Sequence, residues 1–233
     1  MGKTGLSCAR FLQSHRENFS WFDTRETPPG LIDIGKLFPD ADFYCGELDA
    51  SMLCNASEII ASPGVSIMEP ALQAAIQMGV PVIGDIELFV RATRKPIIAI
   101  TGSNAKSTVT TLVGDMAKAC GLRAGVGGNL GTPVLDMLAI DAEIDCYVLE
   151  LSSFQLETTF SLQADVATVL NISDDHMDRY DSLQDYTLAK QKIYNKARCI
   201  VFNRADELTY PSIQVSGQQW SFGLEGGDER GVG

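Results

Sequence analysis

The sequence predicts an α/β protein in which parallel sheets are flanked by helices, and three observations support this fold class. Short, nearly continuous apolar runs recur along the chain, as expected for strands buried on both faces of a parallel sheet. Segments with helical periodicity lie between several of these runs, and strands that alternate with helices are typical of α/β architecture. The apolar fraction of 45% is that of an ordinary globular protein with a sizeable core.

The predicted elements follow one another regularly from the N-terminus. A helical segment at 5–16 precedes a strand at 18–23 (NFSWFD), which ends in Asp23 and is followed by the turn-forming TPPG. The other apolar runs predict strands at 58–64, 80–85, 95–102, 146–153, 165–173 and 198–203. Further helical patterns lie at 69–79, 85–94, 107–120 and 182–197.

The segment RATRKP (91–96) interrupts this pattern with basic residues and a proline, so we place one α/β unit at 1–93 and a second at 94–233. A doubly wound unit normally opens with a strand that leads into its first glycine-rich turn. Here GKTG follows Met1 directly, and no clear helix follows the last predicted strand. We therefore expect a fragment of a longer chain, without the opening strand of the first unit and without the end of the second.

Charge and cysteine content narrow the functional classes. The net charge of −12 argues against a nucleic-acid partner, because affinity for a phosphate backbone depends on neutralisation by Lys and Arg. The six cysteines are scattered without a C-x-x-C pair, which indicates free thiols in a reducing cytoplasm. The sequence holds no apolar run of about 18 residues, so we expect no membrane insertion.

The segment IIAITGSNAKSTVTTL (97–112) predicts a strand, a loop and a helix, with a lysine and a serine where a phosphate loop has them. The general pattern G-x-x-x-x-G-K-[ST] uses glycines to let backbone N–H groups surround the phosphates. Ile100 and Ala105 stand at the two glycine positions, whereas Gly102 comes two positions after the first. A positive φ at Ala105 would cost about 1 kcal/mol, and a negative φ would be tolerated. On the bare pattern, a surface helix that begins with Lys-Ser is equally plausible.

Two groups of acidic residues are further site candidates. The segment NISDDHMDRY (171–180) ends an apolar strand with aspartates and His176, at the sheet edge where α/β proteins bind ligands. It indicates a metal or carboxylate site, with an acidic helix cap as the alternative for the aspartates. Glu150 lies inside an otherwise buried strand, where either Mg²⁺ or a buried lysine would balance its charge.

Two segments carry weaker signals. The glycine-rich GVGGNLG (125–131), which includes Asn129, indicates a flexible turn. The helical pattern at 185–197 contains Lys190 and two other lysines, which by composition indicate a solvated helix face.

Taken together, these segments resemble the Mur ligases of bacterial peptidoglycan synthesis, over nearly the whole chain. The family form of the loop is T-G-[ST]-N-G-K-[ST]-T, so Gly102 stands in its family position and only Ala105 departs. LELSSFQLE and DHMDRY are most similar to the D-glutamate-adding branch of the family. The matching segments are ITGSNAKSTVTTL, GVGGNLG, YVLELSSFQLE, LNISDDHMDRY and AKQKIY, with DTRETPPG, ASPG and GDIELF before them.

The resemblance implies a Rossmann-like domain at 1–93 that binds the uridine nucleotide and a central P-loop ATP-binding domain at 94–233. A C-terminal domain that helps to bind nucleotide and amino acid would be absent. The implied reaction is ADP-forming and adds D-glutamate to UDP-N-acetylmuramoyl-L-alanine through an acyl phosphate, with ATP and two Mg²⁺ ions. We expect the parent to be a cytoplasmic monomer, and this fragment to be inactive alone.

The resemblance also implies roles for individual residues. Lys106 would hold the β- and γ-phosphates, Ser107 and Glu150 would bind a first Mg²⁺, and His176 would serve a second metal. Lys190 would be carbamylated and stabilise that metal, which requires a lowered pKa. The ATP-binding residues would be Gly102, Ser103, Asn104, Ala105, Lys106, Ser107 and Thr108. The substrate-binding residues would be Thr4, Gly5, Leu6, Asp23, Thr24, Arg25, Ser62, Pro63 and Gly64 at predicted strand ends, together with Asn129, Ser152, Gln155 and His176.

Three alternatives to this assignment stay open at this point. A related Mur ligase or a folylpolyglutamate synthase-like ligase would share the loop. The GKTG segment with Asp23 about 20 residues later is similar to a dinucleotide fingerprint, so residues 1–93 alone would suit an NAD-binding module. A P-loop ATPase that acts as a regulator would use the loop without forming an amide bond.

Overall fold

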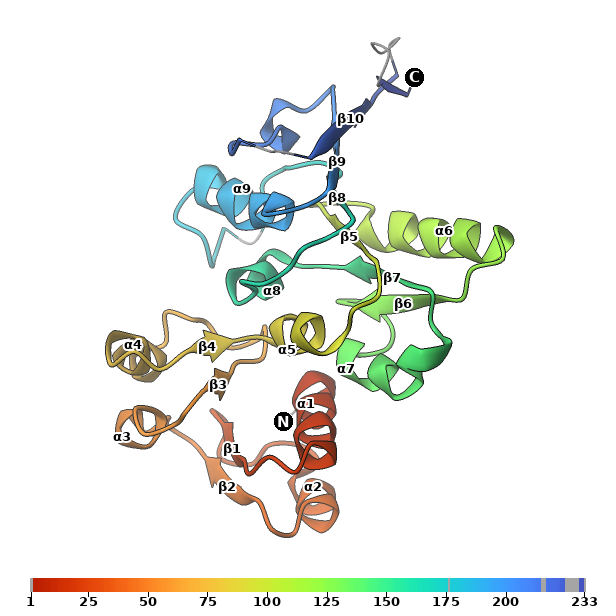
Figure 1. The fold of residues 1–233 in the computed structure, drawn as a ribbon. Helices are drawn as coiled ribbons and strands as arrows, with labels where there is room; N and C mark the ends of the chain where they lie inside the picture. Colours follow the sequence, from red (N-terminus) through yellow and green to blue (C-terminus); the bar gives the residue numbers. More distant parts are fainter. Residues whose placement is uncertain (1, 176, 215–216, 225–230, 233) are drawn as a thin grey trace.

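The computed structural model describes residues 2–175, 177–214, 217–224 and 231–232 (Figure 1). The helices are α1 (Lys3–Ser14), α2 (Leu31–Leu37), α3 (Ala50–Leu53), α4 (Pro70–Gln77), α5 (Asp85–Ala92), α6 (Lys106–Ala119), α7 (Val134–Met137), α8 (Ser153–Glu157) and α9 (Leu183–Gln191). The strands are β1 (Ser20–Asp23), β2 (Asp42–Cys45), β3 (Ile59–Ile60), β4 (Val82–Ile83), β5 (Ile97–Thr101), β6 (Ala124–Gly128), β7 (Cys146–Glu150), β8 (Val166–Val169), β9 (Cys199–Asn203), β10 (Gln218–Phe222) and β11 (Gly231–Val232). Short 3-10 helices lie at Leu138–Glu143, Lys192–Tyr194 and Glu207–Thr209.

The N-terminal part of the chain contains two small parallel sheets. Trp21 of β1 lies opposite Phe43 of β2, and Ile59 of β3 lies opposite Val82 of β4. In a doubly wound sheet the first strand of the chain lies between two such pairs of strands and joins them into one sheet. Among the described residues no strand joins β1 to β3, so the two pairs remain separate sheets.

A seven-stranded parallel sheet forms the second part of the chain, in the order β11-β10-β9-β8-β5-β7-β6. The strand that leads into the predicted phosphate loop, β5, is paired on both sides, because Ile98 lies opposite Val148 of β7 and Val166 of β8. Figure 1 shows α6 on one side of this sheet and α8 and α9 on the other. The loop is therefore anchored in the middle of the sheet.

Side chains of β7 alternate between the two faces of this sheet, as the two-residue period of a strand requires. Tyr147 and Leu149 are fully buried in the larger core, which also contains Tyr186 of α9. Val148 points to the other face and belongs to the cluster against which Val113 of α6 packs. A strand buried on both faces has an apolar run without polar alternation, which is why the sequence pattern identified it.

The observed elements confirm the α/β fold class, and each predicted strand or helix overlaps an observed one. The glycine-rich segment at 125–131 is a correction, because most of it belongs to strand β6 rather than to a flexible turn. Its glycines serve close packing: a Cβ at Gly125 would lie 2.7 Å from the ring of Tyr147, and a Cβ at Gly128 would collide with the carbonyl oxygen of Glu150.

Several predicted segments also end earlier than the pattern indicated, and two of them change conformation at that point. β7 stops at Glu150, and Ser152 then caps helix α8, so the expected strand at 146–153 contains a sharp change of direction. The helix predicted at 182–197 is α9 only as far as Gln191 and continues as a 3-10 turn. Local capping by a serine is a weak signal inside an apolar run, which explains the first difference.

All six cysteines are free thiols, as the sequence predicted. Among the described residues, no helix combines the length and the apolar character that crossing a bilayer demands.

The connection from β5 to α6 contains Ala105 in the left-handed conformation, with φ 63° and ψ 7°. This is the strained alternative of the two that the sequence left open, because an alanine Cβ crowds the backbone there. Gly102 lies in a tight place, since a Cβ at this position would lie 3.1 Å from the Cβ of Leu170.

We predict that Ala105→Gly raises the free energy of unfolding by about 1 kcal/mol, because glycine adopts this φ without the Cβ penalty. Ala117→Gly, within the same helix α6, is a matched control and should lower it by about 1 kcal/mol. Denaturant titrations of both variants and the unaltered chain provide the comparison. A stability of Ala105→Gly at or below that of the unaltered chain would show that the loop accommodates alanine without strain.

Candidate active site

The loop between β5 and α6 is held against the segment that follows β8. The backbone N–H of Ser103 donates to the carbonyl oxygen of Asn171 at 2.9 Å, and the N–H of Asn104 donates to the side-chain oxygen of Asn171 at 2.8 Å. The N–H of Ser173 donates to Ser103 Oγ at 3.0 Å, across 70 positions of sequence. The loop conformation therefore depends on contacts between the carboxyl ends of the two adjacent strands β5 and β8.

Lys106, Ser107 and Thr108 begin α6 at the carboxyl edge of the sheet. Lys106 Nζ donates to the carbonyl oxygen of Ser103 at 3.0 Å, and Thr108 is exposed. The N-cap Ala105 offers no side-chain acceptor to the first turn of this 14-residue helix. Unpaired N–H groups at the start of a helix, together with an adjacent lysine, form a favourable environment for a phosphate.

Glu150 ends β7 and is 2% exposed. Its Oε2 accepts a hydrogen bond from Ser107 Oγ at 2.6 Å, and its Oε1 accepts one from Asn129 Nδ2 at 2.7 Å. The backbone N–H of Asn129 also donates to the carbonyl oxygen of Glu150 at 2.8 Å. This carboxylate therefore connects α6, β6 and β7 at one point.

The residues present here fit a Mg²⁺ ion that is shared with phosphates. The hydroxyl of Ser107 and the carboxylate of Glu150 are hard oxygen donors, which Mg²⁺ prefers, and Mg²⁺ commonly takes one or two carboxylates plus substrate phosphates. No group of three or more His, Cys, Asp or Glu side chains suited to a metal occurs in the described part of the chain.

Lys190 on α9 is 1% exposed, so the interpretation of this lysine as part of a solvated face is wrong. Its Nζ donates to the carbonyl oxygen of Gly102 at 2.9 Å and lies 4.5 Å from the centre of the Tyr186 ring. Burial, reinforced by the positive charge of Lys106, lowers the pKa of Lys190 to about 7. A substantial fraction of this amine is therefore neutral near neutral pH.

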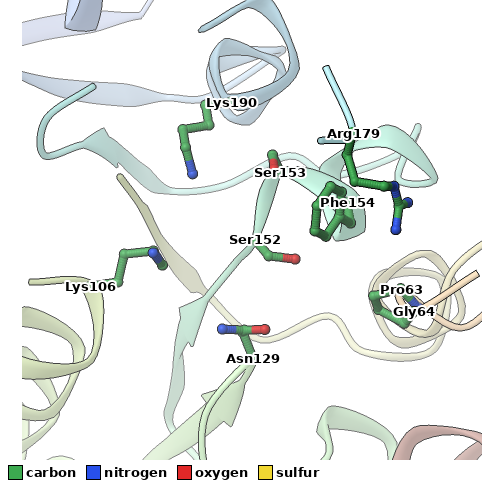
Figure 2. Close-up of a pocket in the computed structure, with 9 residues that line it drawn as sticks. All are labelled: Pro63, Gly64, Lys106, Asn129, Ser152, Ser153, Phe154, Arg179 and Lys190. Carbon is green, nitrogen blue, oxygen red and sulfur yellow. The ribbon is translucent and has the colours of Figure 1, made fainter. Parts of the chain in front are cut away.

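A cavity of about 360 Å³ lies beside these groups (Figure 2). It brings the predicted lysines of the second unit together with the turn that follows β3 of the first. Figure 2 shows Lys106 on one side, Lys190 above, and Ser152 between them and the turn at 63–64. The lining residues are Pro63, Gly64, Lys106, Asn129, Ser152, Ser153, Phe154, Arg179 and Lys190.

Several of the predicted substrate residues lie elsewhere. Gln155 is 3% exposed and forms a capping box with Ser152, which fixes the start of α8. Thr4, Gly5 and Leu6 form part of the first turns of α1 and not a turn before it. The helix begins this early because Gly2 is extended, and the N–H of Leu6 already donates to the carbonyl oxygen of Gly2 at 3.0 Å.

The strand ends of the first unit carry the other predicted residues. The guanidinium of Arg25 forms a two-point ion pair with Asp23, with distances of 2.8 and 2.7 Å, while Thr24 between them is exposed. Ser62 begins the turn after β3, where its carbonyl oxygen accepts from the N–H of Val65 at 2.9 Å. His176 lies outside the described residues.

Three lining residues were missed by the sequence argument, namely Ser153, Phe154 and Arg179. The guanidinium of Arg179 lies 4.3 Å from the centre of the Phe154 ring. Both residues stand inside the segments LELSSFQLE and DHMDRY that were quoted for the resemblance. The available signal was that an aromatic residue follows one strand and an arginine follows the next strand along the chain.

Two family models match this chain. Residues 1–84 match the Mur ligase MurD-like N-terminal domain, and residues 100–231 match the Mur ligase middle domain. Among solved structures, UDP-N-acetylmuramate:L-alanyl-gamma-D-glutamyl-meso-diaminopimelate ligase from Neisseria meningitides aligns over 95% of this chain and 75% of its own, with a TM-score of 0.59 and 15% identity. UDP-N-acetylmuramate-alanine ligase from Thermotoga maritima aligns over 97% and 52%, with a TM-score of 0.50 and 20% identity. These two likenesses concern the fold.

Curated relatives are similar over the full length of this chain. UDP-N-acetylmuramoylalanine–D-glutamate ligases are 56% identical in Pseudomonas fluorescens and 55% in Pseudomonas aeruginosa, over 100% of this chain and 52% of each relative. The enzyme of that name from Legionella pneumophila is 48% identical over 97% of this chain and 51% of its own. The chain thus spans about half the length of the relatives it matches. Because the middle-domain model alone covers more than half of the chain, this protein belongs to the Mur ligase family.

Proposed function

We propose that this chain supplies the ATP site and much of the substrate site of an ADP-forming ligase that adds D-glutamate to UDP-N-acetylmuramoyl-L-alanine. The observation that carries the proposal is the single cavity in which Lys106 of the loop and Lys190 face Asn129, Ser152 and the turn after β3. Relatives named for this reaction are 48 to 56% identical, which supports the choice of reaction within the family. The chain covers about half of each, so activity belongs to the longer protein.

We propose that the boundary between two functional domains lies between residues 93 and 94. Residues 1–93 form the uridine-nucleotide domain and residues 94–233 the ATP domain. The separate sheets on either side of this point support the division, since β1 to β4 do not pair with β5 to β11 among the described strands. The turn at Ser62, Pro63 and Gly64 and the paired Asp23 and Arg25 then lie at the nucleotide-binding edge.

In this proposal the loop from Gly102 to Thr108 holds the phosphates of ATP. The first N–H groups of α6 and the charge of Lys106 attract the β- and γ-phosphates, while Ser107 and Glu150 supply oxygen ligands for Mg²⁺. ATP transfers its γ-phosphoryl group to the substrate carboxylate and leaves as ADP, which gives an acyl phosphate. The amine of D-glutamate then attacks the acyl carbon, an amide bond forms, and inorganic phosphate and a proton are released. The contribution of the protein is positioning and charge neutralisation.

Lys190 takes a different role from Lys106, because its neutral amine is a nucleophile. The nitrogen attacks CO₂, a C–N bond forms and a proton is lost, which leaves a carbamate with the charge of a carboxylate. This carbamate and His176 would then hold a second Mg²⁺. The pairing of these two ligands stays a prediction. The buried position of Lys190 and its pKa of about 7 support this role.

We further propose a cytoplasmic, monomeric parent that binds no nucleic acid. The net charge of −12 supports the last point, because affinity for a phosphate backbone depends on neutralisation by Lys and Arg.

Calorimetric titration of the chain tests the function directly. We expect binding of UDP-N-acetylmuramoyl-L-alanine and, separately, of ATP with Mg²⁺, and no heat change with NAD. Either ligand should also raise the melting temperature of the chain, because a ligand that binds only the folded state stabilises it. Stabilisation by NAD without any effect of the uridine nucleotide would instead favour the dinucleotide-binding module.

For Lys106→Ala, we expect at least a tenfold loss of affinity for ATP with Mg²⁺, because a hydrogen bond to a charged group contributes about 1.5–3 kcal/mol. Lys118→Ala is the matched control, since Lys118 lies at the other end of α6 and its side chain is 56% exposed. In an enzyme of the full length of the relatives, Lys106→Ala should abolish phosphate release that depends on D-glutamate. Near-normal release would remove the loop from the mechanism.

The carbamate on Lys190 should be visible by carbon-13 NMR in the presence of labelled bicarbonate. Its signal should grow as the pH rises through about 7, where the amine loses its proton. Lys190→Arg should abolish the signal, whereas Lys192→Arg, at an exposed position two residues later, should retain it. A signal that survives Lys190→Arg would assign the modification to another amine.

A further inference from the structure

The lining of the cavity differs in charge from the rest of the chain. The sequence contains 30 acidic residues and only 18 Lys and Arg residues. The described lining nevertheless includes Lys106, Arg179 and Lys190 and no Asp or Glu. A concentration of positive charge in a hollow of an acidic protein indicates an anionic ligand.

The three basic side chains are held in two different ways. Lys106 and Lys190 donate to carbonyl oxygens of the loop, at Ser103 and Gly102. The guanidinium of Arg179 instead lies over the Phe154 ring at 4.3 Å. No carboxylate in the described residues forms an ion pair with Arg179, so its hydrogen-bond donors are available to a ligand.

A row of aromatic rings runs from Arg179 to Lys190. The Phe154 and Tyr180 rings stack at 5.8 Å with an interplanar angle of 3°, and Tyr180 contacts Tyr186 at 5.2 Å. Lys190 lies over the far end of the row, on Tyr186. Because three packed rings separate the two cations, Arg179 and Lys190 are kept at different places along the cavity.

Figure 2 shows how these cations are distributed around the cavity. Lys106 and Arg179 lie on opposite sides of Ser152, and the guanidinium of Arg179 is on the side of Pro63 and Gly64. An anion at Arg179 is therefore nearer the first unit, and an anion at Lys106 is nearer the phosphate loop. The cavity has two positive ends.

We propose that Arg179 is a specificity-determining residue that binds the diphosphate of the nucleotide-sugar substrate, and that Phe154 positions it. This inference rests on the proposed function, in which the substrate carboxylate must reach the phosphate held by Lys106. The diphosphate is the other anionic part of that substrate, and it lies towards the nucleotide and hence towards the turn at 63–64. An arginine suits it because the planar fork of donors engages two phosphate oxygens at once.

The test compares Arg179→Gln with the unaltered chain in titrations with three probes. Affinity for UDP-N-acetylmuramoyl-L-alanine should fall roughly tenfold to a hundredfold, since the lost contacts are hydrogen bonds to a charged group. Affinity for N-acetylmuramoyl-L-alanine, which carries no diphosphate, and for ATP with Mg²⁺ should stay within about twofold of the unaltered chain, since neither ligand uses Arg179. Arg179→Lys should recover part of the loss, because it keeps the charge and not the fork.

Matched variants separate this role from a general change in charge or folding. Arg94→Gln removes the same charge from an exposed position away from the cavity and should leave all three affinities unchanged. Phe154→Leu should weaken binding of the nucleotide sugar, and Phe154→Tyr, which keeps the ring under the guanidinium, should restore it. Circular dichroism melts verify that each variant is folded.

The outcomes distinguish a failure of the role assigned to Arg179 from a failure of the proposed function. Equal affinity of Arg179→Gln and the unaltered chain for the nucleotide sugar would overturn the assignment of Arg179 and leave the proposed function standing. An equal loss for the probe with the diphosphate and for the probe without it would also overturn it. Failure of the unaltered chain to bind the nucleotide sugar would reject the proposed function, and the assignment with it.

Discussion

The buried carboxylate of Glu150 is the constraint on which the rest of the site depends. A carboxylate that is 2% exposed is costly unless both oxygens have partners. Ser107 from α6 and Asn129 from the end of β6 are those partners, so the start of the helix and the turn after the strand are fixed by the same group. The close approach of Gly128 to the Glu150 carbonyl exists because the two strands must bring these partners together. Any change at this position affects the phosphate loop and the substrate side at once.

Much of the fold could be predicted from the sequence because its strands are buried on both faces. Runs such as those of β5 and β7 have no polar alternation, and few other structures explain them. Features that depend on contacts between distant parts of the chain have no local pattern in the sequence. The glycines of β6 match a turn by composition, and only the ring of Tyr147 against Gly125 explains them as strand residues. Likewise, Lys190 is in a lysine-rich helix by composition, and its burial depends on packing of that helix against the loop.

The candidate site shows the same limit. Single residues such as Lys106 and Glu150 were recognisable, because each stands in an unusual local context. The hydrogen-bond partners of Glu150 were not recognisable, since Ser107 and Asn129 stand apart in the sequence and meet only in the fold, at this carboxylate. Gln155 shows a second limit: the resemblance implied substrate contact, which stays a prediction, and the capping box that this side chain forms at the start of α8 was not foreseen. Ala105 shows that a position can keep the backbone geometry of a glycine after the glycine is lost, at an energetic cost that the rest of the loop bears.

The central position of β5 also has a consequence for how the protein is made. During synthesis β5 emerges before both of its neighbours, because Ile98 waits for Val148 on one side and for Val166 on the other. Until then a strand of apolar residues has two unpaired edges, which is the state most open to wrong pairing with another chain. Both edges of β5 are thus paired only once β8 has been synthesised, and the loop that β5 carries takes its final shape only when Asn171 and Ser173 have left the ribosome.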